Sequence, residues 1–498
     1  MTRRITIDPI TRLEGHGKIE ILLDDQGDVA DAYLQIPELR GFERFCQGRP
    51  AEEMPRITPR ICGVCPTAHH MASARTLDDL YGVEPPLAAH KVRELLYNLF
   101  MFEDHVLHFF FLGGPDFIVG PDAPAAQRNI LGVVDKVGAD VGRRVIAARK
   151  EARQIIEAMA GKVIHPVFGL AGGVSKPLDA ELAERIRKSS TELIDFAGFA
   201  LQAFHDIVLE NKAYVDTVLA EHFTHRTHYM GLVDADKKVN FYRGKLRVVD
   251  PEGTEVLHFE VRDYLEYVAE HVEPWSYVKF PFLRKPGWKG FEDGADSGVF
   301  RVAPLARLNA SEGMATPRAQ EHYEAFYDTL GGKPVHHTLA THWARLIEAL
   351  QAAEAVHALA RDPAIEDPHV RELPEAEPGE GIGVVEAPRG TLIHHYRTDE
   401  KGMLTFVNLL VATVHNAAPI QMSIRKAAKE VIRGGKADEG VLNMVEMAFR
   451  AYDPCHACAT HALPGEMPLV VNIRSADGEL LQSLHRGLPA ACSDDGAF

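Results

Sequence analysis

Two Cys-x-x-Cys pairs, far apart in the chain, are the residues whose types and spacing could do chemistry. Cys62 and Cys65 lie in "RICGVCPTAHH", whereas Cys455 and Cys458 lie in "DPCHACATH", and 390 positions separate Cys65 from Cys455. A cysteine pair with this spacing can bind a metal ion or cycle between dithiol and disulfide. Four of the six cysteines of the chain fall in these two pairs, so we expect the functional site of the protein to contain them.

Four kinds of site use cysteines in such pairs. A thioredoxin-like redox site needs a single pair beside a βαβ unit, and a c-type haem needs Cys-x-x-Cys-His without a gap, which neither pair has. A structural zinc ion suits four thiolates, although its ligands usually come from one short segment. A nickel or iron centre also takes soft thiolates, and an active centre can use the whole fold to join distant loops. The spacing leaves zinc and a redox metal open.

The elements that must bring the two loops together are mostly helical. Apolar residues recur with helical spacing, whereas alternating runs beside turn residues indicate strands. We expect strands within 3–36, 238–262 and 382–396, with hairpins at 16–36 and 248–259. We expect helices over 68–81, 87–112, 125–160, 179–222, 317–330, 337–361, 419–433 and 438–451. These patterns predict an α+β fold that is predominantly helical, and no composition break divides it into domains.

Composition narrows the class of protein. The 498 residues are 46% hydrophobic and carry a net charge of −17, which excludes a broad surface for nucleic acid or anionic membranes. No secretory signal is readable at the start, and no apolar run reaches the roughly 18 residues that span a bilayer. We therefore expect a soluble, cytoplasmic protein with no membrane span. No Gly-rich phosphate motif occurs, so we expect no bound nucleotide, and we interpret Cys46 and Cys492 as ordinary free cysteines.

Five motifs together carry a resemblance to a known family. "DPITRLEGHG", "RGFERF", "RICGVCPTAHH", "EAPRGTLIHHY" and "AYDPCHACATH" follow one another in this order between Ile5 and His461. In this the chain resembles the large, catalytic subunit of nickel–iron hydrogenases. Within the family it is most similar to the cytoplasmic, multi-subunit group, which includes the methyl-viologen-reducing type coupled to heterodisulfide reductase and the bidirectional NAD-reducing type. The resemblance implies one domain over 1–461 with a central helical bundle and small peripheral β-sheets.

The resemblance assigns the cysteines to a nickel–iron pair. It implies that Cys62 and Cys455 are terminal nickel ligands and that Cys65 and Cys458 bridge nickel to iron, which carries carbon monoxide and cyanide. Such soft, strong-field ligands suit iron that handles H2. The reaction it implies is heterolytic cleavage of H2, with one proton taken by a nearby base, and we expect Cys458 to take it first.

Other residues take roles from the same resemblance. Glu14 matches the glutamate that relays protons between a thiolate and water. Arg389 matches an arginine over the open metal position, with Pro388 beside it and Asp104 and Asp453 as its carboxylate partners.

Histidines divide into one functional residue and several structural ones. By resemblance, His69 hydrogen-bonds a bridging cysteine and tunes its basicity. His70 has no such match, and we interpret it as structural. His105 and His108 are expected in the core, and His394 and His395 on a strand.

A second metal site and a cleavage site are implied near the end of the chain. Glu43, His461 and the backbone carbonyl at about Leu409 match the ligands of a structural magnesium ion, in some relatives iron. In this family an endopeptidase cuts after the histidine once nickel is inserted. Cleavage between His461 and Ala462 would remove residues 462–498, whose "MPLVVNI" and "LLQSL" could form a hairpin across "SADGE".

The resemblance also implies partners. The chain has no cysteines left for an iron–sulfur cluster, so electrons would pass to an iron–sulfur small subunit, then to further electron-transfer subunits, such as a flavoprotein, heterodisulfide reductase or an NAD-reducing module. H2 and protons are the substrates, and the final electron acceptor is not set by this chain. Three alternatives remain: a regulatory H2 sensor, which would lack the cleaved tail; a metal-free relative such as the quinone-binding subunit of complex I, disfavoured by the four cysteines; and a zinc-stapled scaffold protein.

Overall fold

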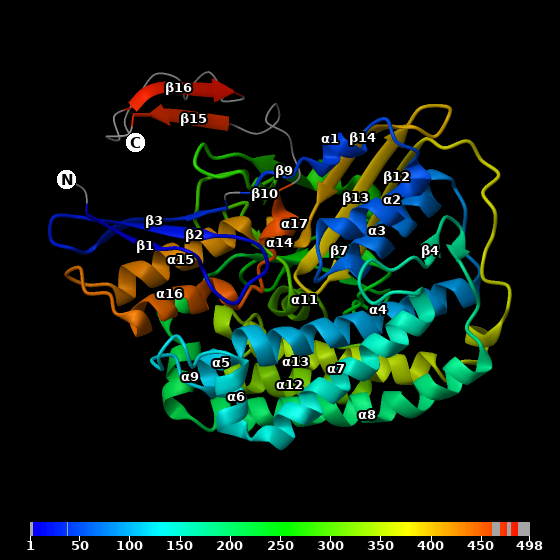
Figure 1. The fold of residues 1–498 in the computed structure, drawn as a ribbon, viewed down its shortest axis with the longest axis horizontal. Helices are drawn as coiled ribbons and strands as arrows, with labels where there is room; N and C mark the ends of the chain where they lie inside the picture. Colours follow the sequence, from blue (N-terminus) through cyan, green and yellow to red (C-terminus); the bar gives the residue numbers. More distant parts are fainter. Residues whose placement is uncertain (1–2, 37, 461–468, 476–479, 487–498) are drawn as a thin grey trace.

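The computed structural model describes residues 3–36, 38–460, 469–475 and 480–486, and its largest layer is a set of long helices (Figure 1). Helix α13 lies at the centre of this layer, packed against α4, α8 and α12, and α7 packs against α4 and α8. Nearly every residue of α13 up to Ala353 is buried, as expected for a helix covered on all sides. The bounds are α4 (Leu87–Leu107), α7 (Ala139–Ala160), α8 (Ala180–Phe204), α12 (Pro317–Leu330) and α13 (Thr341–Leu359).

Two of the expected helices are interrupted. The predicted helix over 125–160 is α6 (Ile130–Val137) followed by α7, because Gly138 adopts φ 90°, a conformation that favours glycine and ends a helix. The predicted helix over 179–222 stops as α8 at Phe204, continues as one π-helical turn, and begins again as α9 (Lys212–Val218). Asn211 starts α9 by accepting a hydrogen bond from the amide of Ala213 (3.1 Å). Helical spacing alone did not reveal these caps.

The N-terminal strands form an antiparallel sheet in the order β1–β2–β3, with β1 (Arg3–Ile7), β2 (Lys18–Leu23) and β3 (Val29–Gln35). The predicted hairpin is therefore confirmed. This sheet packs on α15 (Ala417–Val431), where the Gln421 amide accepts a hydrogen bond from Leu34 N (2.9 Å) and donates to Ala32 O (2.5 Å). The sheet thus fixes the loop between β1 and β2, which carries Glu14, against the C-terminal half of the chain.

A second sheet in the middle of the chain was predicted only in part. Strands β7 (Lys245–Val249) and β8 (Glu255–Phe259) form the expected hairpin, whereas β6 and β11 complete the order β11–β6–β7–β8. Every residue of β6 is buried, so it lacks the alternation that marks a half-exposed strand. The bounds of the strands not predicted are β4 (Gly169–Leu170), β5 (Gly173–Val174), β6 (His228–Val233), β9 (Val268–His271), β10 (Phe280–Leu283) and β11 (Phe300–Arg301).

The third sheet lies beside the first cysteine loop and contains β12 (Glu380–Ala387), β13 (Gly390–Thr398) and β14 (Leu404–Leu410). The single strand expected over 382–396 is in fact a hairpin. Ala387 pairs with Gly390, so Pro388 and Arg389 form its two-residue turn. Helix α3 (Pro66–Leu80) covers β12 and β13.

Two glycines of β12 allow that helix to lie very close to the strand. A Cβ at Gly383 would stand 2.6 Å from Thr76 N, and a Cβ at Gly381 would stand 2.3 Å from Thr76 O. Both distances are too short for any side chain, so glycine lets α3 and β12 meet backbone to backbone.

Each of the two cysteine loops leads into a helix. Cys62 to Cys65 lead into α3, and Cys455 and Cys458 flank the start of α17. The remaining helices are α1 (Phe42–Cys46), α2 (Met54–Ile57), α5 (Pro115–Ile118), α10 (Tyr264–Tyr267), α11 (Pro304–Ala310), α14 (Ala412–His415), α16 (Glu439–Arg450) and α17 (His456–Ala459). The predicted fold class, predominantly helical α+β with small sheets, is confirmed.

The C-terminal segment forms the predicted hairpin, in which β15 (Leu469–Arg474) pairs with β16 (Leu480–Arg486). Figure 1 shows this hairpin at the periphery of the molecule. His461 and Ala462, the predicted cleavage site, lie outside the described residues, as does Cys492. Within the described ranges, no helix combines the length and apolar character needed to cross a membrane.

Candidate metal centre

The four cysteines of the two loops meet in the interior. The sulfurs of Cys62 and Cys455 lie 3.3 Å apart, and so do those of Cys65 and Cys458. All four sulfurs are within 4.8 Å of one another, and none of the residues is more than 4% exposed. Loops that are 390 positions apart in the sequence therefore form one compact group of four sulfur ligands.

The electrostatics of this group favour a cation. Hydrogen bonds from Cys455, and then from Cys458 and Cys65, lower the pKa of the Cys62 thiol. Burial raises the pKa of Cys455 and of Cys458 far above that of a free thiol. One negative charge is thus shared among buried thiols, and a metal ion would stabilise the others as thiolates. Four sulfurs without a hard oxygen ligand suit a soft metal such as nickel, iron or zinc.

Glu14 contacts the second loop directly. Its carboxylate oxygen Oε2 accepts hydrogen bonds from the Cys455 thiol (2.9 Å) and from the amide of Ala457 (3.1 Å). Its backbone carbonyl accepts from the amide of His456 (3.0 Å). Burial and the neighbouring Cys62 charge raise the pKa of Glu14. A carboxyl that is bonded to a ligand sulfur and has a raised pKa can exchange a proton with that sulfur.

This geometry favours a different cysteine from the one expected from the sequence. Cys458 was expected to take the first proton, yet the carboxylate bonds to Cys455. The sulfur of Cys458 instead lies 3.5 Å from Nε2 of His69 and 3.3 Å from the Cys65 sulfur. The two cysteines of one loop point to different neighbours because they lie three positions apart at the start of α17, and spacing alone could not tell which one meets Glu14.

Arg389 lies between two buried aspartates. Its guanidinium donates to both oxygens of Asp104 (3.1 and 3.2 Å) and to Asp453 (3.1 Å). All three residues are at most 3% exposed. Burial alone would lower the pKa of Arg389, but the charges on Asp104 and Asp453 raise it, so the guanidinium stays charged. The structure brings these three residues together as the sequence predicted.

A small cavity joins this arginine to the cysteines. Arg389, Cys65, Cys455 and Cys458 line it together with His69. Pro388 does not line the cavity, but it precedes Arg389 in the turn of the β12–β13 hairpin, where its carbonyl lies 3.5 Å from Nη2 of Arg307. A small molecule in this cavity could touch both the sulfurs and the guanidinium.

His70 in the first motif, His105 near the end of α4 and His108 directly after α4 have structural partners. His70 Nδ1 lies 2.7 Å from Pro55 O, and His70 Nε2 accepts from the amides of Phe168 and Gly169 (3.1 and 2.8 Å). His105 lies 3.0 Å from Glu348, and His108 lies 3.0 Å from Arg450 O. His108 Nε2 is nevertheless only 3.8 Å from the Asp453 carboxylate. His108 thus lies next to a residue of the candidate site, although the sequence predicted only a packing role for it.

Two of the residues expected at a second metal site lie in contact. Glu43, on α1, is buried, and its Oε1 accepts a hydrogen bond from the amide of Leu409 (2.9 Å). The third expected ligand, His461, lies outside the described residues. Thr460, which precedes it, accepts a hydrogen bond from the amide of Arg40 (3.1 Å), three positions from Glu43. Thr460, the residue before His461, therefore lies beside the segment that leads into α1 and Glu43.

Several residues that support the loops were not identified from the sequence. The Arg40 guanidinium donates to the carbonyls of Ile61 and Ala457 and so joins the two cysteine loops. Arg40 begins the quoted "RGFERF" motif, and that position was the available signal. Thr413 Oγ1 accepts from the amide of Cys455 (3.1 Å), and nothing in its sequence context marks it.

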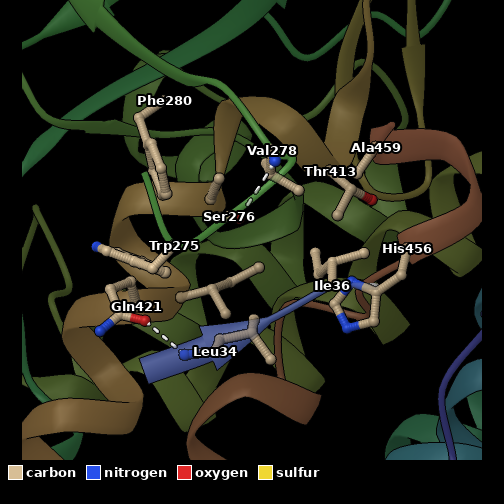
Figure 2. Close-up of a pocket in the computed structure, with 12 residues that line it drawn as sticks. Leu34, Ile36, Trp275, Ser276, Val278, Phe280, Thr413, Gln421, His456 and Ala459 are labelled. Carbon is tan, nitrogen blue, oxygen red and sulfur yellow. Dashed lines mark hydrogen bonds between the residues drawn. The ribbon is translucent and has the colours of Figure 1, made fainter. Parts of the chain in front are cut away.

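An apolar pocket lies beside the second loop (Figure 2). Its walls include Leu34 of β3, Ile36 directly after that strand, Trp275 and His456. Neither ring nitrogen of His456 has a hydrogen-bond partner among the described residues, and burial lowers its pKa to about 4. His456 is thus a neutral packing residue between the two cysteines, and the pocket offers no ligand set of its own.

Comparison with known proteins places relatives along nearly the whole chain. Residues 40–129 and 233–461 match the family model of nickel-dependent hydrogenases, and residues 4–39 match a model described as HoxL-like. The chain is 48% identical to an iron-sulfur subunit of the F420-non-reducing hydrogenase from Archaeoglobus profundus, over 97% of this chain and 99% of that protein. It is 41% identical to the beta subunit of the NAD-reducing hydrogenase HoxS from Cupriavidus necator, over 98% of this chain and all of that protein.

Solved structures agree with this comparison. A chain of an NAD+-reducing [NiFe]-hydrogenase, solved in its H2-reduced state, superposes with a TM-score of 0.86 and 38% identity. The match covers 92% of this chain and all of that chain.

Proposed function

This chain belongs to the nickel-dependent hydrogenases, and we propose that Cys62, Cys65, Cys455 and Cys458 hold its nickel–iron centre. The resemblance to the large subunit of nickel–iron hydrogenases, noted in the sequence motifs, is confirmed, and the chain is the catalytic subunit of a hydrogenase. The observation that carries the site is the group of four buried sulfurs within 4.8 Å, built from two distant loops. In the expected arrangement Cys62 and Cys455 would hold nickel, and Cys65 and Cys458 would hold both nickel and an iron that carries carbon monoxide and cyanide.

The bound metals would supply the position at which H2 is cleaved into protons and electrons. The surrounding residues move the proton and exclude water. We assign proton exchange to the Cys455 sulfur and Glu14 Oε2, whose 2.9 Å contact supports this route. This assignment replaces the one made to Cys458. From Glu14, which is half-buried, the proton can pass toward the surface.

Arg389 is proposed to act by charge and orientation. Its guanidinium lies at the cavity that the cysteines line, and hydrogen bonds to Asp104 and Asp453 hold it there. Asp104 and Asp453 therefore orient the arginine, and Pro388 shapes the turn that presents it. A fixed positive charge in a buried site stabilises negative charge that develops there.

Glu43, the Leu409 carbonyl and His461 are proposed to hold a second ion, magnesium or iron. The contact between Glu43 and the Leu409 amide supports the first two positions. A carboxylate, a carbonyl and several waters suit a hard divalent cation.

Residues 1–461 are proposed as the mature domain and 462–498 as an extension that a maturation endopeptidase removes after His461. The proposal rests on the family resemblance, because the cleavage site lies outside the described residues. Intact mass spectrometry of the metal-loaded protein tests it. A mass that ends at His461 is expected, whereas active enzyme that retains residues 462–498 would contradict it.

An iron–sulfur small subunit is the proposed electron partner, with further subunits that carry electrons to an acceptor. The relatives are subunits of F420-non-reducing and NAD-reducing enzymes, which supports assembly in the cytoplasm with such modules. Outside the centre, Cys46 is the remaining cysteine in the described ranges, and it cannot ligate a cluster alone.

Metal analysis and one matched pair of variants test the centre. We expect one nickel and one iron per chain at the centre. Cys62→Ser should lose the nickel. Cys46→Ala is the control, because it removes a buried cysteine outside the centre, and it should retain the nickel. Zinc alone would favour the scaffold alternative. Hydrogen uptake that survived Cys62→Ser would refute the assignment.

A further inference from the structure

A chain of hydrogen-bonded side chains runs from Cys458 into the interior. Cys458 Sγ lies 3.5 Å from His69 Nε2, and His69 Nδ1 lies 3.2 Å from His394 Nε2. His394 Nδ1 lies 2.6 Å from the Tyr396 hydroxyl, which lies 3.2 Å from Ser73 Oγ. The chain therefore links a sulfur ligand to a phenol and a serine through two imidazoles.

Two elements provide the four side chains. His69 and Ser73 lie four positions apart on α3 and so share one helical face, whereas His394 and Tyr396 lie two positions apart on β13 and share one face of the sheet. The close approach of α3 to β12 and β13 brings these faces together. The sequence placed His394 on a strand, but the pairing of the two faces exists only in the tertiary structure.

The chain is sealed from water. His69, Ser73, His394 and Tyr396 are all completely buried. A charged imidazole is costly to bury, and the contacts above are to a sulfur, a phenol and another imidazole, so these rings are neutral. Because no member reaches the surface, the chain does not deliver protons to solvent.

Each neutral imidazole has one N–H and one acceptor nitrogen, so the hydrogen bonds must all run in one direction. A sulfur bound to metal has no hydrogen to donate and can only accept. His69 must then carry its hydrogen on Nε2 and accept at Nδ1 from His394 Nε2–H. His394 Nδ1 must in turn accept from the Tyr396 hydroxyl, so metal binding requires the phenol hydrogen to turn toward His394 and away from Ser73 Oγ, the acceptor that it has in this structure. The reverse order requires a hydrogen on Cys458.

We propose that His394 and Tyr396 are positioning residues that hold His69 in the tautomer whose Nε2–H donates to the Cys458 sulfur. The inference rests on the proposed role of Cys458 as a metal ligand. Tyr396 fixes the direction of these hydrogen bonds. An imidazole can carry its hydrogen on either ring nitrogen, whereas the phenol hydrogen stays on its one oxygen. Without that hydroxyl, His394 can turn its N–H toward the vacant side, and His69 would then face the sulfur with a lone pair.

Direct observation of the tautomers tests the proposal on the unmodified sequence. The metal-free full chain is labelled with 15N-histidine and loaded with Zn(II), a diamagnetic probe that binds thiolates. Long-range 15N–1H spectra then report which ring nitrogen carries the hydrogen, with His69 and His394 assigned from His69→Gln and His394→Gln. We expect Nε2–H for both residues. Nδ1–H at either one would overturn the proposal.

Metal affinity provides a second readout that does not depend on hydrogenase activity. Co(II) is titrated into the reduced, metal-free full chain, and sulfur-to-cobalt absorption bands report binding. Tyr396→Phe and His394→Gln are expected to weaken Co(II) binding about ten- to a hundredfold, as for other residues that orient a metal ligand. In Tyr396→Phe, the 15N spectra should also show His69 with Nδ1–H.

Tyr229→Phe is a matched control. The Tyr229 hydroxyl also lies 2.6 Å from a histidine nitrogen, Nδ1 of His336, and Tyr229 is completely buried, but Tyr229 lies on β6 and His336 lies between α12 and α13. Its loss should leave Co(II) affinity unchanged. Equal Co(II) affinity in wild type and Tyr396→Phe would overturn the positioning role alone. Wild-type binding without sulfur-to-cobalt bands would overturn the four-cysteine centre as well.

Discussion

The contact between Glu14 and Cys455 ties a titratable side chain to one particular sulfur. The carboxylate also accepts the Ala457 amide, and the Glu14 carbonyl accepts the His456 amide, so three bonds fix the N-terminal loop on the second cysteine loop. At Gly15, φ is 82° and a Cβ would stand 2.8 Å from Ala457 N, so only glycine permits this approach. The contact between the two loops therefore requires glycine at position 15 as well as glutamate at position 14.

Glu14→Gln should separate proton transfer from metal binding. The amide can still hydrogen-bond its neighbours but cannot exchange a proton near neutral pH, so we expect nickel content to be retained and H2 oxidation to fall about 10²- to 10⁴-fold. Metal analysis and H2-dependent dye reduction measure the two effects. Glu53→Gln, at an exposed glutamate, is the control. Full activity in Glu14→Gln would exclude it as the proton relay.

Arg389→Lys should show that geometry matters beyond charge. Lysine keeps one positive charge, but it cannot donate to Asp104 with two nitrogens and to Asp453 at once. We expect H2 oxidation to fall about 10²- to 10³-fold, with the metals retained. Arg397→Lys makes the same change at an exposed position of β13 and should have wild-type activity. Similar activity in the two variants would remove Arg389 from the site.

At the scale of elements, the approach of α3 to β12 positions both the first cysteine loop and His69. Gly383→Ala would place a Cβ 2.6 Å from Thr76 N and push the helix away from the strand. We expect a loss of about 1–3 kcal/mol in the free energy of unfolding and weaker metal binding. Gly379→Ala is the matched control, because nothing lies within 4 Å of its Cβ position. Thermal or urea unfolding compares the two, and equal stability would refute this view of the packing.

Asp116 joins three elements that surround the centre. Its carboxylate accepts from Arg12 (2.5 Å), in the β1–β2 loop, and from Arg450 (2.6 Å), at the end of α16. Burial alone would raise the pKa of Asp116, but the charges of Arg450 and Arg12 lower it.

Asp116→Asn leaves the two arginines without this counter-charge, so we expect a loss of about 3–5 kcal/mol in urea unfolding. Asp140→Asn removes an exposed ion pair with Arg143 and should cause no measurable change. Equal unfolding midpoints for the two variants would contradict a structural role for the Asp116 network.

For the whole molecule, buried neutral histidines should govern acid stability. Burial lowers the pKa of His70 and His415 to about 4 and that of His342 to about 3. Above the ordinary value of 6.5 these side chains are neutral in both states and contribute no pH dependence. Below it, the unfolded chain binds protons that the folded protein does not.

The free energy of unfolding should therefore fall as pH falls from about 6.5 toward 4, by up to about 1.4 kcal/mol per pH unit for each histidine. Urea unfolding at pH 7.5 and 5.5 measures the effect. A protein equally stable at both values would show that these histidines are accessible to protons.

Local sequence patterns predict the long helices well and the turns poorly. Helix α12 begins at Pro317 and ends before Gly331, as its spacing and end signals indicate. At Pro388 and Arg389 the pattern predicts continuous strand where the structure has a hairpin turn, because the residues on both sides are apolar and buried. Strand β6 escapes prediction for a similar reason, since burial on both faces removes the alternation that distinguishes strands.

The sequence by itself determined the four cysteines, the mostly helical class and the family, because ligand types and their spacing are written in the order of residues. The family resemblance of its motifs also implied that Asp104 and Asp453 pair with Arg389, as the structure has them. Only the tertiary structure decided that Glu14 meets Cys455 rather than Cys458, and that His69 leads to His394 and Tyr396. Such partners lie hundreds of positions apart, and their contacts depend on how helix and strand faces pack, which no local pattern encodes.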